Sequence, residues 1–280
     1  MILVIGTVCL FQCRTSPTAP ATREEIIISG YLVVGQGIDS VFVSRSLPIT
    51  ATYTRATAAV TADSVLLTVD GLRHRLLEYL ACPGGYYLPR NVLTVTPGKT
   101  YHLEVHALGR TLRASAMAPE QVHITSCDPD TGIFPYPDTE LSRRFNLAWT
   151  PTAHTAAYII SVIAKPPYEL ASFGMDNLVR ERIKQFDGDT LRAFPPVRDL
   201  PVGKDGKSLE ISWFAFPYYG DYTIKLYAAD DALWDLATSA VVFLTQSSEF
   251  EQPVTNVEGG LGIFTAVSVD SVHAFVRKQE

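Results

Sequence analysis

The sequence lacks the features that several common classes of protein require. Lys and Arg total 23 against 29 Asp and Glu, which gives a formal net charge of −6 and no basic stripe. Because phosphate backbones are bound through clustered Lys and Arg, nucleic acid is excluded as a partner. No apolar run approaches the ~20 residues of a membrane-spanning helix. The sequence therefore predicts a protein that neither binds nucleic acid nor crosses a membrane by a helix.

Signatures of catalysis and cofactor binding are also missing. The chain contains neither His-Glu-x-x-His nor Gly-x-Ser-x-Gly. The pair Gly260 and Gly262 lacks the last glycine and the βαβ surroundings of a dinucleotide fingerprint. We therefore predict no catalytic, cofactor-binding or metal-binding residues, and a protein that is not an enzyme.

What is present favours β structure. Hydrophobic residues make up 47% of the 280 residues, so a sizeable core is available. Thr, Val, Ser and Tyr are plentiful, whereas runs of Ala, Leu, Glu and Lys are scarce, and this mixture is typical of strands. The length suits two ordinary domains or one large β domain.

Residues 25–117 contain short alternating runs separated by turn signals. The spacing of roughly ten residues, without a helical period, predicts an antiparallel β-sandwich domain. Asp70 and Gly71 indicate a hairpin because both tolerate positive φ. The predicted strands include residues 31–34, 40–44, 65–69, 100–106 and 111–115.

One of these strands carries a possible ligand ladder. His102, Glu104 and His106 lie on the same face, since alternate side chains of a strand point to the same side. A metal could recruit two of them, but no third ligand is indicated. We favour the other interpretation, the solvent-facing side of a half-buried strand.

Residues 118–280 are predicted to form a second sandwich. The runs 145–149 and 158–162 alternate apolar and polar residues around a loop and predict a hairpin, with Trp149 in the core. This pattern resembles Leu-x-Trp and Tyr-x-Ile-x-Val in fibronectin type III-like modules. The resemblance implies an immunoglobulin-like sandwich for this half of the chain.

The second sandwich contains helical segments. A helical insert is predicted near residues 176–187, where Asp176 can cap the helix. A second helix is predicted for residues 231–236, with Asp231 as its capping residue. The insert has an apolar stripe at helical spacing, formed by Leu178, Val179, Ile183 and Phe186.

A glycine-rich stretch near the end, Asn256-Val-Glu-Gly-Gly-Leu-Gly-Ile-Phe264, is the most distinctive feature. Gly259, Gly260 and Gly262 free the backbone for positive φ or a close approach to another segment. Phe264 then begins an apolar strand that continues to residue 275. We interpret the stretch as a structural motif that sets this last strand into the second sandwich.

The N-terminus resembles a lipoprotein signal peptide. Residues 1–13 are apolar and end in Leu10-Phe-Gln-Cys13, which resembles a bacterial lipobox, although Gln12 replaces the usual small residue. Residues 14–24 are rich in Pro, Thr and Ala, as a flexible tether is. We expect lipid on Cys13; an N-terminal core strand is the alternative interpretation.

Two cysteines remain if Cys13 carries lipid and Cys9 is removed with the signal peptide. An even number of cysteines in an exported protein is consistent with a disulfide, so a bridge between Cys82 and Cys127 is one hypothesis. Two unrelated thiols are the other.

Several stretches together resemble one family, an uncharacterised group of lipoproteins from Bacteroidota-type bacteria with a domain of unknown function. They are the Cys13 start, residues 30–34, 41–46, 97–101, 115–119 and 226–236, and above all the glycine stretch. The resemblance implies an outer-membrane lipoprotein, often encoded near TonB-dependent receptors, without catalytic residues.

These observations lead to two hypotheses about function. The first is a non-enzymatic, lipid-anchored accessory or binding component of an outer-membrane, TonB-dependent transport complex, with an outer-membrane receptor as its protein partner. The second is an envelope carbohydrate- or peptide-binding module or hydrolase. It would use exposed aromatic side chains, for which the candidates are Tyr86, Tyr87, Tyr218 and Tyr219. Core and rim packing is the simpler interpretation of these tyrosines.

Overall fold

The computed structural model describes residues 24–48, 50–128, 133–135, 145–171, 176–245 and 254–278. These segments are mainly β structure with a few short helices, as the sequence predicted. None of the helices in these ranges has both the length and the apolar character that a membrane crossing needs. The predicted signal peptide, Cys13 and residues 14–23 of the tether lie outside the described residues.

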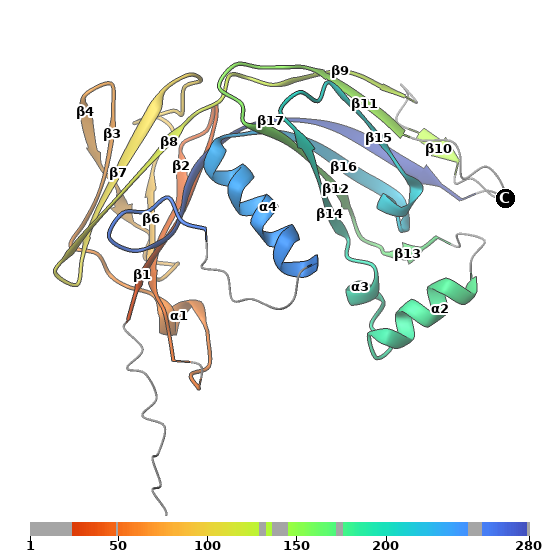
Figure 1. The fold of residues 1–280 in the computed structure, drawn as a ribbon, viewed down its shortest axis with the longest axis horizontal. Helices are drawn as coiled ribbons and strands as arrows, with labels where there is room; N and C mark the ends of the chain where they lie inside the picture. Colours follow the sequence, from red (N-terminus) through yellow and green to blue (C-terminus); the bar gives the residue numbers. More distant parts are fainter. Residues whose placement is uncertain are drawn as a thin grey trace, which may run out of the picture.

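One large sheet runs through both halves of the molecule (Figure 1). Its strand order is β14-β12-β16-β17-β1-β2-β6-β5, and two further strands pair at the side, β10 with β17 and β13 with β16. The strands are β1 (Ile26–Val33), β2 (Ile38–Arg45), β5 (Leu77–Glu78), β6 (Gly85–Leu88), β10 (Ile133–Pro135), β12 (Ala157–Ala164), β13 (Glu169–Leu170), β14 (Val197–Gly203), β16 (Tyr218–Ala229) and β17 (Leu261–Arg277).

Two small sheets cover the outer side of this large sheet, one over each half (Figure 1). Each pair of sheets encloses a hydrophobic core. The chain passes from the first core to the second between Ala118 and Val122, and it returns to the first core at Val257, Phe264 and Ala266. One small sheet has the order β4-β3-β7-β8 and consists of β3 (Ser64–Val69), β4 (Leu72–Arg75), β7 (Thr100–Ala107) and β8 (Arg110–Met117). The other has the order β15-β11-β9 and consists of β9 (His123–Asp128), β11 (Phe145–Thr150) and β15 (Ser208–Ile211).

Strand β17 joins the two sandwiches. Its first half pairs in parallel with β1, and its second half pairs antiparallel with β16. Phe264 and Ala266 therefore pack in the first core, whereas Ala274 and Val276 pack in the second. The prediction that the glycine stretch leads this strand into the second sandwich is wrong for its first half. A strand of 17 residues extends roughly 55 Å, enough to cross both cores.

The predicted hairpin around Trp149 is a connection between two sheets. β11 pairs with β9 and β15 in the small sheet, whereas β12 pairs with β14 and β16 in the large one. Trp149 is buried between them, with its ring centroid 5.3 Å from that of Tyr158. The core position of Trp149 is confirmed. The pairing was wrong because alternation identifies the buried face of a strand and not its partner.

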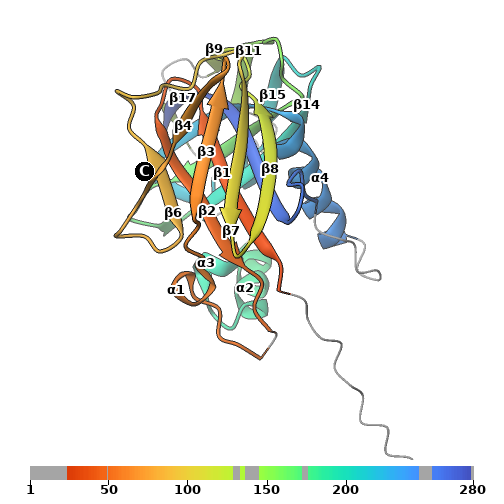
Figure 2. The same ribbon diagram turned by 90° about the vertical axis from the view of Figure 1, so that its left-hand side faces the viewer.

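Helices occupy the inner side and the lower rim of the arch that the large sheet forms (Figures 1 and 2). The predicted insert contains α2, whose Val179 and Ile183 pack against the second core together with Phe186, the residue after the helix. Helix α4 is longer than predicted and lies in the concavity of the large sheet. The helices are α1 (Arg55–Ala58), α2 (Asp176–Gln185), α3 (Thr190–Ala193), the 3-10 helix η1 (Trp213–Ala215) and α4 (Asp231–Thr245).

Candidate functional site

The inner face of the large sheet has a groove beside α4. Its volume is about 620 Å³, within the ~300–1,000 Å³ of typical small-molecule sites. Most of the lining is apolar, with a few polar groups among the apolar ones. The lining residues are Tyr31, Ile159, Ser161, Ile163, Val197, Asp199, Pro201, Tyr227, Leu233 and Ala237.

Strand register places the lining side chains on one face. Ile159, Ser161 and Ile163 alternate along β12 and pair with Pro201, Asp199 and Val197 of β14. The intervening residues of β12 point the other way into the second core. β12 is therefore almost wholly buried and reads as a nearly continuous apolar run.

A polar corner interrupts the apolar lining. Ser161 is 6% exposed and donates a hydrogen bond to the carboxylate of Asp199, which is itself exposed at the side of the groove. Tyr227 borders the same corner, and burial, followed by the negative charge of Asp199, raises the pKa of Tyr227. The corner therefore presents a carboxylate oriented by Ser161 to any donor group that enters.

Tyr31 lies on the β1 side of the groove. Burial, and next the negative charge of Asp230, raise the pKa of Tyr31 to about 12. The ring is still 37% exposed. At neutral pH its hydroxyl is therefore protonated and can donate or accept one hydrogen bond from a ligand.

Asp230 fixes the helix that forms one wall of the groove. This carboxylate is 6% exposed and accepts hydrogen bonds from Leu233 N at 3.1 Å, from Ala266 N at 2.9 Å and from Thr265 Oγ1. Burial raises its pKa, against the lowering effect of these hydrogen bonds. The predicted capping residue was wrong by one position: Asp230 caps α4, and Asp231 is its first helical residue.

The groove combines an apolar body with donors and acceptors at its sides, which is the composition of a binding site. Among the described residues, no group of three or more His, Cys, Asp and Glu side chains could hold a metal ion. The chemistry that these side chains support directly is therefore hydrogen bonding and apolar contact with a ligand.

The glycine stretch lies elsewhere, at one side of the first sandwich. Gly259 and Gly262 have φ of 81° and 112°, values that L side chains rarely adopt. A Cβ atom on Gly260 would lie 2.6 Å from the carbonyl oxygen of Ile26. Phe264, which follows, is completely buried. The three glycines thus permit the close approach that the sequence suggested, but against β1 and β8.

Hydrogen bonds join this stretch to both sheets of the first sandwich. The Asn256 amide donates to Phe264 O at 2.7 Å and accepts from Phe264 N at 2.9 Å, as a neighbouring strand would. Glu258 and Arg113 exchange two backbone hydrogen bonds, of 2.7 and 3.1 Å. The stretch is therefore a structural connection between β17 and β8.

Glu104 and His106 of the His-Glu-His ladder belong to an ion-pair cluster on the outer surface of the four-stranded sheet, and His102 is exposed. Glu104 contacts His106 Nε2 at 2.9 Å, Arg73 Nη2 at 2.5 Å and Arg113 Nε at 3.1 Å. The His106 hydrogen bond, followed by that of Arg113, lowers the pKa of Glu104. The solvent-facing interpretation of this strand is confirmed.

Of the two hypotheses for Cys82 and Cys127, the structure shows two unrelated cysteines and no bridge between them. Cys82 lies in the turn before β6 and accepts a hydrogen bond from Arg55 Nη1 at 3.0 Å. Cys127 lies in β9, opposite Leu147 in the three-stranded sheet. The two cysteines thus belong to different sandwiches, a separation that sequence spacing does not reveal.

The paired tyrosines are mainly core residues. Tyr86 and Tyr218 are 5% and 0% exposed, and both hydroxyls bind backbone. Tyr86 accepts from Ala62 N at 2.6 Å, and Tyr218 donates to Phe194 O at 2.5 Å. Their neighbours Tyr87 and Tyr219 are half-buried. Core and rim packing therefore explains these four residues, and the groove does not include any of them.

Sequence reasoning missed every residue of the groove. The lining residues come from four strands and a helix that are far apart in the chain, so no local sequence motif identifies the groove. One signal was available: Ser161 interrupts the apolar run of β12, and a buried polar residue in such a strand needs a partner. The identity of that partner, Asp199, depends on a register that only the structure provides.

Comparisons with known proteins give a family and no activity. The family described as "Domain of unknown function (DUF4249)" matches residues 15–272. None of the curated proteins matches the chain. The crystal structure of chicken CNTN1 FN1-FN3 domains is 12% identical over 91% of this chain and 67% of that one. Its TM-score of 0.27 is too low to support an argument about function.

Proposed function

Because the chain belongs to a family described only as "Domain of unknown function (DUF4249)", we propose a function from the geometry of the chain itself. The protein is a non-enzymatic binding protein of the cell envelope, and its ligand enters the groove beside α4. The observation that carries this proposal is the groove itself, an apolar hollow with the Ser161–Asp199 pair and two tyrosine rings at its sides.

A lipid on Cys13 attaches the protein to the membrane in this proposal. The lipobox-like Leu10-Phe-Gln-Cys13 supports it, as does the composition of residues 14–23, which separate Cys13 from the first described residue, Glu24. The stretches that resemble Bacteroidota-type lipoproteins favour the outer membrane as the location. They also favour an accessory role beside a TonB-dependent receptor, to which the protein would present its ligand.

Ligand binding is tested by filling the groove. Ala237 of α4 lines it, and Ala237→Trp would occupy much of the space next to Leu233. Envelope metabolites, glycans and short peptides would be screened for compounds that raise the melting temperature of the wild type. We expect such compounds to lose their effect on Ala237→Trp and to keep it on Asp205→Asn, a change in an exposed turn. Equal stabilisation of both variants would show that the ligand does not use the groove.

The polar corner gives a second, finer test of the same site. Asp199→Asn keeps the size of the side chain but removes its negative charge, and it changes the acceptor for Ser161. For a ligand that donates a hydrogen bond here, we expect a loss of affinity of roughly ten-fold, corresponding to about 1.5 kcal/mol. Unchanged affinity would restrict recognition to the apolar lining.

Anchoring and partnership are tested separately. Growth with labelled palmitate and intact-mass measurement of the mature protein would detect lipid on Cys13, with Cys13→Ala as the unlabelled control. An unlabelled wild-type protein that still begins at Met1 would refute the anchor. Affinity purification from detergent-solubilised outer membranes should recover a receptor, and recovery of none would count against the accessory role.

A further inference from the structure

Large hydrophobic side chains are exposed at one end of the first sandwich. Four of them come from three separate segments: the loop before α1, the turn before β6 and the turn between β7 and β8. They are Tyr53, Tyr79, Leu80 and Leu108, which are 71%, 51%, 89% and 59% exposed. We name this set the tether-end surface, because β1 also begins there.

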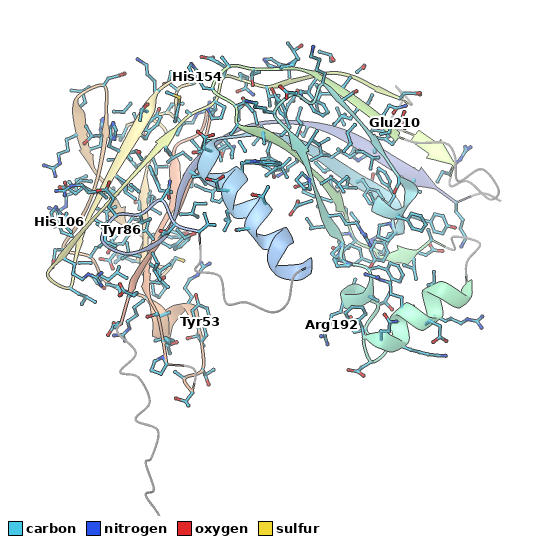
Figure 3. All side chains as sticks on the ribbon, viewed as in Figure 1. Tyr53, Tyr86, His106, His154, Arg192 and Glu210 are labelled. Carbon is cyan, nitrogen blue, oxygen red and sulfur yellow. The ribbon has the colours of Figure 1, made fainter. Side chains whose placement is uncertain are left out.

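Contacts between the segments place them at the same end. The Arg55 guanidinium at the start of α1 donates to Cys82 Sγ at 3.0 Å, which joins the loop of Tyr53 to the turn of Leu80. Glu25 N donates to Ser46 Oγ at 2.9 Å, so the start of β1 lies beside the end of β2. Figure 3 shows Tyr53 beside α1 at this lower end.

The turn between β7 and β8 reaches the same place. Arg110, which begins β8, forms an ion pair with Glu25 at 3.0 Å. Figure 2 shows the joined lower ends of β7 and β8 next to the start of β1. Leu108 has φ of 50°, a conformation in which Gly or Asn is usual. Neither the backbone conformation nor burial favours leucine at this position. An apolar surface that contacts Leu108 would account for the residue.

We propose that the tether-end surface rests on the lipid bilayer to which Cys13 is attached. The inference depends on the proposed lipid anchor for its orientation. Residues 14–23 lie between Cys13 and Glu24, and ten residues span at most ~35 Å. A lipid on Cys13 would therefore hold this end of the first sandwich nearer to the bilayer than the other surfaces of the protein. Tyrosine suits the boundary between lipid headgroups and acyl chains, where its apolar ring and polar hydroxyl are both accommodated, and leucine can insert its apolar side chain at the edge of the acyl chains.

The arrangement also orients the rest of the molecule. With Tyr53, Leu80 and Leu108 against the bilayer, the strands of the first sandwich stand upright on the membrane. The concave inner face of the large sheet, with α4 in it, then opens on the same side as the tether-end surface, toward the membrane (Figure 1). A ligand would enter the groove from the space between the protein and the membrane.

Fluorescence quenching tests the contact. The wild type, Leu80→Trp and Leu72→Trp would be attached through Cys13 to vesicles of phosphatidylethanolamine and phosphatidylglycerol that contain brominated phosphatidylcholine. Leu72 is the matched control because it is 66% exposed and begins β4, beside the turn at the other end of the first sandwich. Subtracting the wild-type emission removes the signal of the three native tryptophans. We expect brominated lipid to remove most of the added emission of Leu80→Trp and little of that of Leu72→Trp.

Equal quenching of the two variants, or quenching of neither, would overturn the proposal. A failure of the anchor is recognised independently, by the absence of palmitate on Cys13. In that case the chain from residue 14 onward, with an N-terminal histidine tag, would be held on the same vesicles by a nickel-chelating lipid. The same difference between Leu80→Trp and Leu72→Trp is then required.

Discussion

At the scale of single residues, Asp230 sets a pH dependence of stability. Its folded-state pKa is raised above the ordinary 3.8 by burial. The folded state therefore holds more protons than the unfolded state between 3.8 and the raised value, and stability contributed by Asp230 falls as pH rises through that window. Asparagine does not titrate, so in Asp230→Asn this contribution is constant.

The comparison of Asp230→Asn with the wild type measures this effect. We expect the wild type's advantage in unfolding free energy to be largest near pH 4 and to shrink as pH increases, in denaturant titrations at a series of pH values. Asp205→Asn, in an exposed turn of another part of the chain, is the control: it retains Asp230 and should keep the pH dependence of the wild type. An advantage that grows with pH would mean that the carboxylate is favoured in its charged form.

Gly260 gives a second prediction at this scale. Valine there would place Cβ 2.6 Å from Ile26 O and against the Leu112 side chain, so β1 or β8 must move. We expect Gly260→Val to lower the unfolding free energy by about 3 kcal/mol or to prevent folding. Gly203→Val is the control, since nothing lies within 4 Å of its Cβ position. Folded Gly260→Val with normal stability and no ligand binding would instead identify the stretch as a recognition site.

At the scale of elements, the loop of residues 254–260 depends on one side chain. Asn256 makes both hydrogen bonds to Phe264 and a third, weaker one to Ser115 O. Asn256→Ala leaves the peptide groups of Phe264 without these partners, at a cost of about 2 kcal/mol in stability. We also expect faster amide hydrogen exchange in this loop and at the start of β17. Unchanged exchange would show that the glycine conformations alone hold the loop.

Elements were predictable from the sequence to the extent that they are local. Alternation found most strands, and helical spacing found α2, because both signals are contained in a few consecutive residues. The partners of β17 and of β11 were not predictable, since period two specifies a face and leaves the neighbouring strand open. The groove was not predictable for the same reason: Ser161 and Asp199 are 38 residues apart and come into contact only through the register between β12 and β14.

At the scale of the whole molecule, the shared sheet predicts cooperative unfolding. Trp149 reports on the second core, and Tyr101, fully buried in the first, contributes to the aromatic signal of that core. Because β17 pairs with β1 and with β16, loss of either pairing disturbs both cores. We expect coincident denaturant transitions by tryptophan fluorescence and by far-UV circular dichroism. Two separated transitions would show that the sandwiches fold independently despite the common strand.

The parallel pairing of β1 with β17 also determines when the protein can fold during its synthesis. Among the described strands, β1 is synthesised first, and one of its two neighbours is formed by residues 261–267 of β17, far along the chain. Until that segment arrives, one edge of β1 and the cavity that Phe264 fills remain open. The first sandwich therefore cannot be completed until β17 has been synthesised, and a chain that stops short of β17 would leave the first sandwich incomplete as well as the second.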